Sequence, residues 1–193
     1  MTLRHPPRFF TFAALCGLSI FTMSCGSSAP DSAEPSGGAP SVFGDPATAP
    51  PSIGAVTPAS GSGQSAVFRL LVSHPGGASQ INDVQFLVAE VLPGPGQTAC
   101  WVDINSGKFV SVRNEQGSAF FPASPIGSRT GVSNSRCSVP AADVKVESSG
   151  SQVAITLPVS FSPGFKGAKK IWVIASGPSK HSGWQERGSW KVE

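Results

Sequence analysis

The side chains best suited to chemistry lie close to the carboxyl terminus, in the segment GWQERGSW. Trp184 and Trp190 bracket Arg187 in this polar stretch. An indole has an apolar face that can stack on a sugar ring, and a guanidinium can donate hydrogen bonds to hydroxyl groups. Two exposed, adjacent rings would therefore form a carbohydrate site. The alternative is that both tryptophans fill one end of the domain and that Arg187 stacks on a ring.

Groups for catalysis are scarce. His5 lies in the predicted signal peptide, so only His74 and His181 would remain in the mature chain. His181 is next to Ser182, but no acidic residue is placed to orient its imidazole. A hydrolase would need such a pair, or two carboxylates that converge in one cleft, and no spacing pairs the carboxylates of this sequence. Nucleotide-binding, zinc-protease and nucleophile-elbow motifs do not occur. We therefore expect no enzymatic activity, no cofactor and no metal.

Residues 1–24 are typical of an export signal. Arg4 and Arg8 precede an apolar run over residues 9–23, which is too short for the roughly 20 residues of a membrane-spanning helix. Cys25 follows among small residues, and this arrangement resembles the lipobox of bacterial lipoproteins, in which the cysteine is acylated and becomes the first residue. The alternative is cleavage by an ordinary signal peptidase and release of a secreted product.

The remaining cysteines predict one disulfide. Cys16 lies in the apolar run and would be removed with it, whereas Cys25 would carry lipid. Cys100 and Cys137 are then an even pair in an exported domain. In the chain-entropy treatment, a bridge that closes the loop between them stabilises the fold by about 4 kcal/mol. Two unpaired, buried cysteines are the alternative.

These sites must be positioned by a folded domain that follows a linker. Residues 25–52 are rich in Gly, Pro, Ser and Ala, a composition that cannot bury enough apolar surface to offset its ordering entropy. We expect a disordered linker here and a folded domain over residues 53–193. Hydrophobic residues make up 39% of the chain, which suffices for a core.

Short apolar runs separated by turn residues predict that this domain is all-β. Five apolar residues alternate strictly over 153–161, as in a strand with one buried face. We expect Trp172 in the core and Trp101 against the disulfide. The fold class is a single Ig-like β-sandwich with one disulfide, with a barrel as the alternative. Further strands are predicted at 65–73, 82–91, 100–104, 108–112, 168–175 (apolar on both faces, hence central) and 189–192, with a hairpin loop at 105–107.

Several segments together resemble a β-sandwich module that recurs in secreted and surface proteins of acidobacteria and similar soil bacteria. The resemblance places cysteines at the positions of Cys100 and Cys137, which supports their pairing. Related modules tend to read Ser-Asp-Pro-Asn-Gly where this chain reads SHPGG at 73–77. The resemblance implies a fold and an extracytoplasmic location only. It carries no implication about activity. The segments are 56–58, 61–63, 99–100, 133–137, 161–165 and 182–190.

The sequence favours a non-enzymatic, lipid-anchored module of the cell envelope for surface display, adhesion or assembly, exposed to the periplasm or on the cell surface. The alternative is a carbohydrate- or peptidoglycan-binding lipoprotein that uses the C-terminal Trp/Arg segment. The expected partners are the membrane, through the lipid anchor, and an envelope polysaccharide or protein. A net charge of +3 is too small to indicate nucleic acid. The basic cluster Lys166, Lys169 and Lys170 is interpreted as solvated rather than as an anion site.

Overall fold

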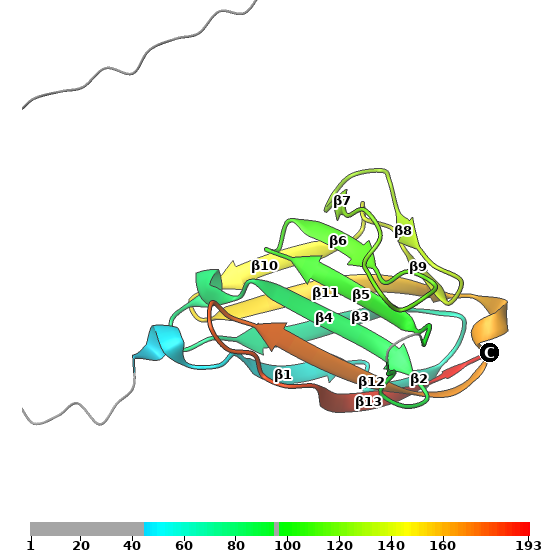
Figure 1. The fold of residues 1–193 in the computed structure, drawn as a ribbon, viewed down its shortest axis with the longest axis horizontal. Coiled ribbons are helices and arrows are strands. Elements are labelled where there is room, and N and C mark those ends of the chain that lie inside the picture. Colours follow the sequence, from blue (N-terminus) through cyan, green and yellow to red (C-terminus); the bar gives the residue numbers. More distant parts are fainter. Residues whose placement is uncertain (1–44, 95–96) are drawn as a thin grey trace, which may run out of the picture. The chain divides into compact units, whose positions relative to one another are not determined.

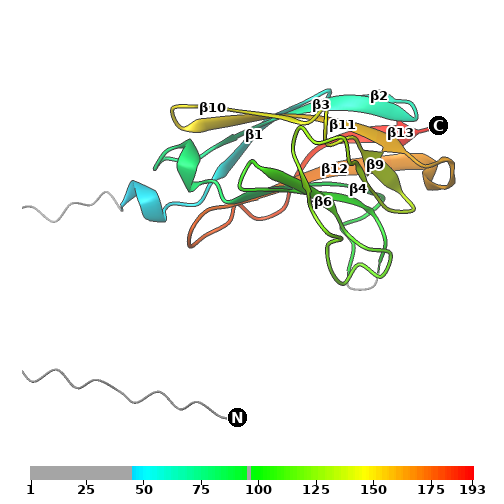
Figure 2. The same ribbon diagram turned by 90° about the horizontal axis from the view of Figure 1, so that it is seen from above.

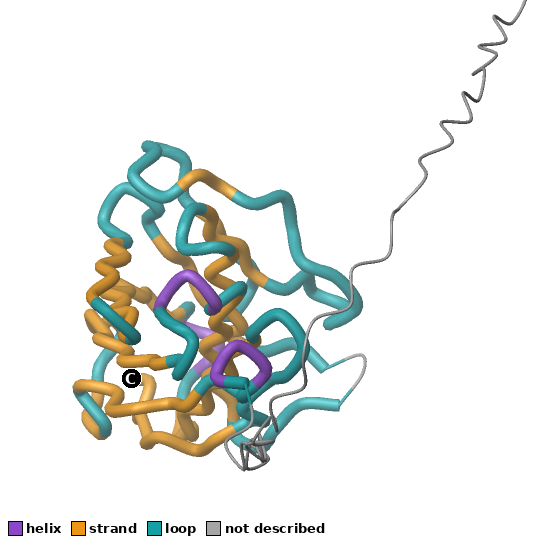
Figure 3. The backbone as a smooth tube through the Cα atoms, turned by 90° about the vertical axis from the view of Figure 1, so that its left-hand side faces the viewer, coloured by secondary structure: helices purple, strands orange, loops and turns teal. Residues whose placement is uncertain are grey.

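The computed structural model describes residues 45–94 and 97–193. The predicted signal peptide, Cys25 and most of the predicted linker therefore lie outside the described residues. Within them the chain forms strands and loops with three short 3-10 turns and no α-helix (Figure 3). The elements are η1 (Pro46–Thr48), β1 (Ser52–Thr57), β2 (Ser60–Ser62), β3 (Ser65–Ser73), η2 (Ala78–Gln80), β4 (Asp83–Ala89), β5 (Cys100–Asn105), β6 (Phe109–Val112), β7 (Ser124–Pro125), β8 (Val132–Ser133), β9 (Cys137–Val139), β10 (Lys145–Ser149), β11 (Gln152–Phe161), η3 (Pro163–Phe165), β12 (Gly167–Ser176) and β13 (Gln185–Val192).

The strands form two stacked sheets, seen face-on in Figure 1 and from above in Figure 2. Sheet A has the order β1-β3-β11-β9-β8, with β10 also paired to β11. Sheet B has the order β2-β13-β12-β4-β5-β6-β7. All pairs are antiparallel except β2 with β13. The predicted all-β sandwich is confirmed.

The core lies between the sheets and is built by alternation. Every second residue of β11, from Val153 to Phe161, is buried, as the period of two predicts. Phe68 of sheet A and Phe86 of sheet B meet at the centre with ring centroids 4.9 Å apart. Both rings are fully buried, so they contribute a large part of the hydrophobic stabilisation of this core.

Strand β12 is central in sheet B, between β13 and β4, as its two apolar faces predicted. Ile171 and Val173 point into the sandwich, whereas Trp172 points to the outer face, where it is opposite Leu87 of β4. Both Trp172 and Leu87 are buried. The outer face of sheet B is therefore partly apolar, and other side chains must cover it.

The predicted hairpin loop joins β5 to β6. Ser106 and Gly107 both have a positive φ, and the amide of Lys108 donates to the carbonyl of Asn105. Glycine adopts this left-handed conformation without steric cost, which explains its place in the turn.

The last residues of the predicted linker have a defined structure. Asp45 caps η1 by accepting a hydrogen bond from the amide of Ala47 at 2.9 Å, and Pro51 is buried. A Cβ atom on Gly76 would lie only 3.0 Å from the Cα of Ala47, so η1 packs closely on the turn after β3. The chain thus enters the sandwich at the end where β3 finishes and β11 begins.

Candidate functional site

The predicted disulfide joins Cys100 of β5 to Cys137 of β9, with Cα atoms 5.4 Å apart. It links the two sheets, and it lies beside Phe161 at the end of β11, opposite to the end where the chain enters. Both cysteines are buried in the core. The pairing predicted from the cysteine count is confirmed.

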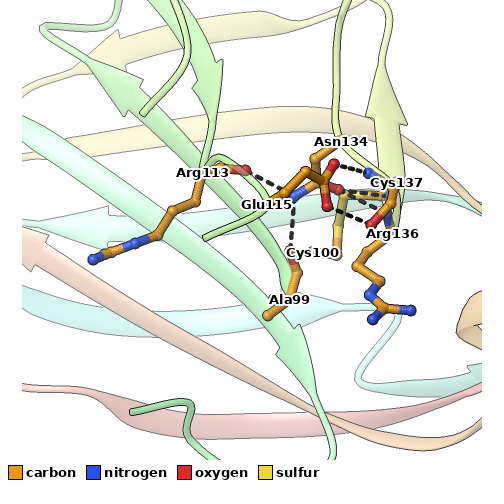
Figure 4. The surroundings of a disulfide bond; sticks show 8 residues. Ala99, Cys100, Arg113, Glu115, Asn134, Arg136 and Cys137 are labelled. Carbon is orange, nitrogen blue, oxygen red and sulfur yellow. Dashed lines mark hydrogen bonds between the residues drawn. A yellow bond between two sulfur atoms is a disulfide. The ribbon is translucent and has the colours of Figure 1, made fainter. Parts of the chain in front are cut away.

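A half-buried asparagine braces this bridge (Figure 4). The side-chain amide of Asn134 donates to the carbonyl oxygens of Ala99 and Arg113, both at 2.9 Å. Its carbonyl oxygen accepts from the amides of Arg136 at 2.9 Å and of Cys137 at 3.0 Å. One side chain therefore forms hydrogen bonds with four backbone groups around the disulfide. These bonds connect the start of β9 to the residue before β5 and to the residue after β6.

The structure does not bring Trp184 and Trp190 together. Trp190 is 6% exposed and points into the sandwich, where its Nε1 donates to the carbonyl of Gly63 at 2.9 Å. Trp184 packs instead on the outer face of sheet B. The two rings lie on different faces because the register between β12 and β13 is irregular. Ile171 pairs with Gly188, but the next residue, Trp172, pairs with Glu186, so Arg187 has no partner in β12. The extra residue is a bulge that reverses the faces of the residues on either side of it.

Arg187, the extra residue of this bulge, has a structural role in place of the expected stacking. Its Nη2 donates to the carbonyl of Ile53 in β1 at 2.8 Å and also bonds to Gln185. Because β1 belongs to sheet A and β13 to sheet B, this side chain connects the two sheets at one edge. The tryptophan-arginine segment is therefore not a joint, exposed binding platform.

A different group of aromatic side chains gathers on the outer face of sheet B. We call Trp101, Phe120, Trp184 and Arg113 the outer aromatic cluster. The ring of Trp101 meets Trp184 edge-on at 5.3 Å and Phe120 edge-on at 6.2 Å between centroids. The Cζ of Arg113 lies 4.0 Å from the centroid of Trp101. This arrangement combines edge-to-face aromatic packing with a cation–π contact.

The position of Trp101 corrects the prediction that it packs against the disulfide. Successive residues of a strand point to opposite faces. Cys100 points into the sandwich, so Trp101 points outward, onto the face that carries Leu87 and Trp172. Trp172 is buried as predicted, although it lies in this outer layer and not between the sheets.

A row of polar groups continues from the cluster along β4 and β5. The indole Nε1 of Trp101 donates to Oε1 of Gln85, and Nε2 of Gln85 donates to Oδ2 of Asp83, both at 2.9 Å. Burial, and to a smaller extent the charge of Asp83, raises the pKa of the neighbouring Asp103 from 3.8 to about 7. Asp103 thus keeps its proton at weakly acidic pH.

This geometry suits the binding of a neutral, hydroxyl-rich ligand. Trp101 and Trp184 are half-buried, so parts of their rings remain available for contact. The amide and the two carboxyl groups beside them supply both donors and acceptors. An apolar wall next to a few fixed polar groups is the usual composition of a small-ligand site.

The two histidines occupy different settings. His181 is exposed and its Nδ1 accepts a hydrogen bond from the amide of Gly183 at 3.0 Å. His74 is fully buried where the chain enters, its Nδ1 accepts from the amide of Gly76 at 3.0 Å, and its Nε2 has no partner among the described residues. Neither histidine is paired with an acid in the described part of the chain.

The basic cluster differs from its prediction in one member. Lys166 and Lys170 are exposed, and Lys170 forms an ion pair with Glu186 at 2.8 Å. Lys169 is buried instead, and its Nζ lies 2.9 Å from Oε1 of Glu90. The hydrogen bond and the charge of Lys169 lower the pKa of Glu90. The cause is position, because Lys169 is opposite the inward-pointing Trp190 in the β12–β13 pair.

Residues 45–94 and 97–193 contain no group of three or more His, Cys, Asp or Glu side chains that could hold a metal ion. Over the same part of the chain, no helix has the length and apolar character needed to cross a membrane. No model of a known protein family matches this chain, and no curated protein matches it either.

Proposed function

We propose that this chain is a non-enzymatic, lipid-anchored module of the cell envelope that presents its sandwich for adhesion or assembly. The observation that supports this best is the place where the linker meets the domain. Ala47 packs on Gly76 at one end of the sandwich, while the disulfide lies at the other. The described part of the linker thus leaves the outer face of sheet B and the disulfide end uncovered.

Two further points support a binding role over a hydrolytic one. Neither histidine is paired with an acid in the described part of the chain, whereas a hydrolase of the triad type needs an acid that orients its histidine. The segments that resemble modules of secreted and surface proteins also agree with a position outside the cytoplasm. An adhesion module needs a stable surface, and a disulfide-braced sandwich supplies one.

The anchor is tested by detergent phase partitioning of the protein expressed in a bacterium with a lipoprotein pathway. We expect the Cys25→Ala variant to move from the detergent phase to the aqueous phase. A Cys16→Ala variant is the matched control, since Cys16 lies in the segment that maturation removes, and it should partition like the wild type. Identical partitioning of the Cys25→Ala variant and the wild type would contradict the lipid anchor.

A second candidate function is carbohydrate or peptidoglycan binding, and the outer aromatic cluster favours it. The ligand would contact Trp184 and Trp101, with Gln85 and Asp83 as hydrogen-bonding groups. This site replaces the predicted C-terminal platform, because Trp190 belongs to the core.

The carbohydrate site is tested by retention of the purified protein on insoluble peptidoglycan and on common polysaccharides. Trp184→Ala should abolish retention, whereas Val67→Ala, which removes an exposed apolar side chain of sheet A, should not. If no matrix retains the wild type, or if both variants behave alike, the carbohydrate function is excluded and a protein-interaction role stays as the proposal.

A further inference from the structure

A hollow of about 450 Å³ opens at the disulfide end of the sandwich, between the loop after β4, η3 and the first residues of β12. Glu90, Arg136, Lys166 and Lys169 supply its charged lining, and Phe165 forms part of its wall. The hollow lies at the end opposite to η1, and no side chain of the outer aromatic cluster lines it. It is therefore a separate feature from the site proposed above.

Lys169 provides a fixed positive charge inside this hollow. Its side chain is 3% exposed, and lysine is rarely buried unless it is paired. Nζ donates to Oε1 of Glu90 and to the carbonyl of Lys166, both at 2.9 Å, and lies 4.8 Å from the centroid of Phe165. The partner carboxylate of Glu90 is 73% exposed, so solvent screens it strongly.

Arg136 provides a second cation near the same ring. Its Cζ lies 5.9 Å from the centroid of Phe165. Its Nε is buried and has no hydrogen-bond partner among the described residues. In Figure 4 its guanidinium points away from the network around Asn134 and the disulfide. A buried donor without an acceptor is uncommon, so the described residues do not fully satisfy this guanidinium.

The charges of the hollow are unbalanced. Arg136, Lys166 and Lys169 oppose the single carboxylate of Glu90, which leaves an excess of positive charge. We propose that this hollow binds an oxyanion group of a ligand, a carboxylate or a phosphate. Arg136 supplies the forked donors that match such a group, Lys169 supplies the buried charge, and the exposed Lys166 contacts the anion at the rim.

The test is isothermal titration of the purified protein with sodium phosphate and, separately, with sodium glucuronate. Ionic strength is held constant with sodium chloride, and a chloride titration provides the baseline. We expect saturable binding with one site for at least one anion. Binding of phosphate alone identifies a phosphate group as the ligand chemistry, and binding of glucuronate alone identifies a carboxylate. Absence of saturable binding to either anion would overturn the proposal.

Substitutions in the lining distinguish binding in the hollow from non-specific binding to surface charge. Arg136→Gln should weaken binding at least tenfold, and Lys166→Gln should weaken it a few-fold without a risk to folding, because Lys166 is exposed. Lys145→Gln, at an exposed lysine of β10 that does not line the hollow, should leave binding unchanged. Equal affinities in all three variants would overturn the proposal.

Glu90→Gln should change the affinity for the anion in the opposite direction. Removal of this carboxylate leaves Lys169 with its charge and without its acidic partner, so the anion should bind more tightly. The same anion should then raise the melting temperature of Glu90→Gln by more than it raises that of the wild type. An affinity that falls in Glu90→Gln would contradict the assignment of Lys169 to the site. The outer aromatic cluster plays no part in these measurements, so their outcome is independent of the carbohydrate test.

Discussion

The ring of Trp190 meets the ring of Phe68 edge-on across the two sheets, with centroids 5.4 Å apart. Gly61 of β2 lies directly against the same indole, and a Cβ atom built there would overlap the ring atom Cζ3. Trp190 is thus held between the short parallel strand β2 and the core. This contact, and not ligand binding, accounts for an aromatic residue at this position.

Truncation of the two C-terminal tryptophans should therefore have unequal effects on stability. Trp190→Ala removes a buried ring and leaves a cavity, which should lower the free energy of unfolding by about 3–5 kcal/mol. Trp184→Ala, at a half-buried position, should cost less than half as much. Urea unfolding followed by fluorescence of the remaining tryptophans measures both. Equal losses would contradict the placement of the two rings on opposite faces of sheet B.

Two glycines provide a matched pair for the packing of Trp190. Gly61→Ala should destabilise the domain by about 1–3 kcal/mol, because the new methyl group overpacks against the indole. Gly164→Ala in η3 has no atom within 4 Å of the new Cβ and no positive φ, so it should be neutral or slightly stabilising. Thermal unfolding of both variants tests this, and a neutral Gly61→Ala would show that β2 yields to the added group.

Loss of the disulfide should lower the melting temperature markedly. The double variant Cys100→Ala/Cys137→Ala frees the chain between β5 and β9, at a cost of about 2–4 kcal/mol. Reduction of the wild type should give a similar shift, and the reductant should leave the melting temperature of the double variant unchanged. A wild type with two titratable thiols before reduction would contradict the bridge.

The domain should lose stability as the pH rises from about 4 to about 7. In this interval Asp103 keeps its proton in the folded state, where its pKa is about 7, but loses it in the unfolded state, near the ordinary value of 3.8. The unfolded state then binds fewer protons, so the free energy of unfolding falls with pH and levels off above the folded pKa. Partial exposure limits the loss to about 2 kcal/mol.

Asp103→Asn isolates this contribution. The variant carries no ionisable group at this position, so its stability should be flatter over the same interval and should exceed that of the wild type at pH 8. Denaturant midpoints measured at one-unit steps of pH check both statements. A wild type and a variant with parallel pH profiles would contradict the burial of this carboxyl beside Asp83.

Much of the sandwich could be predicted from local patterns. The alternation from Val153 to Phe161 identifies β11 because a strand with one buried face has a period of two. The disulfide follows from the number of cysteines left after the predicted signal peptide and Cys25 are set aside. Strand β1 and the short strands β7 to β9 were not predicted, because they hold few apolar residues and depend on neighbouring strands for their hydrogen bonds.

The composition of the site could not be predicted for a different reason. Trp184 and Trp190 are six residues apart and would share a face of a regular strand, but the bulge at Arg187 separates them. The contact of Trp101 with Gln85 depends on the register between β4 and β5, which no single segment specifies. Lys169 becomes buried only because its pairing with β13 directs it inward. Each of these features is set by pairing between strands.

The direction of β1 determines how the domain would respond to a mechanical force applied at its two ends. Strand β1 begins at the end where η1 packs and runs antiparallel to β3 toward the opposite end, the end of the disulfide and the hollow. If the proposed lipid anchor held one end while a ligand held the other, tension would act along β1. The hydrogen bonds between β1 and β3 are perpendicular to that direction, so they would be loaded in shear. They would then have to break together and not one after another. Such a geometry suits a protein that must hold a surface against flow.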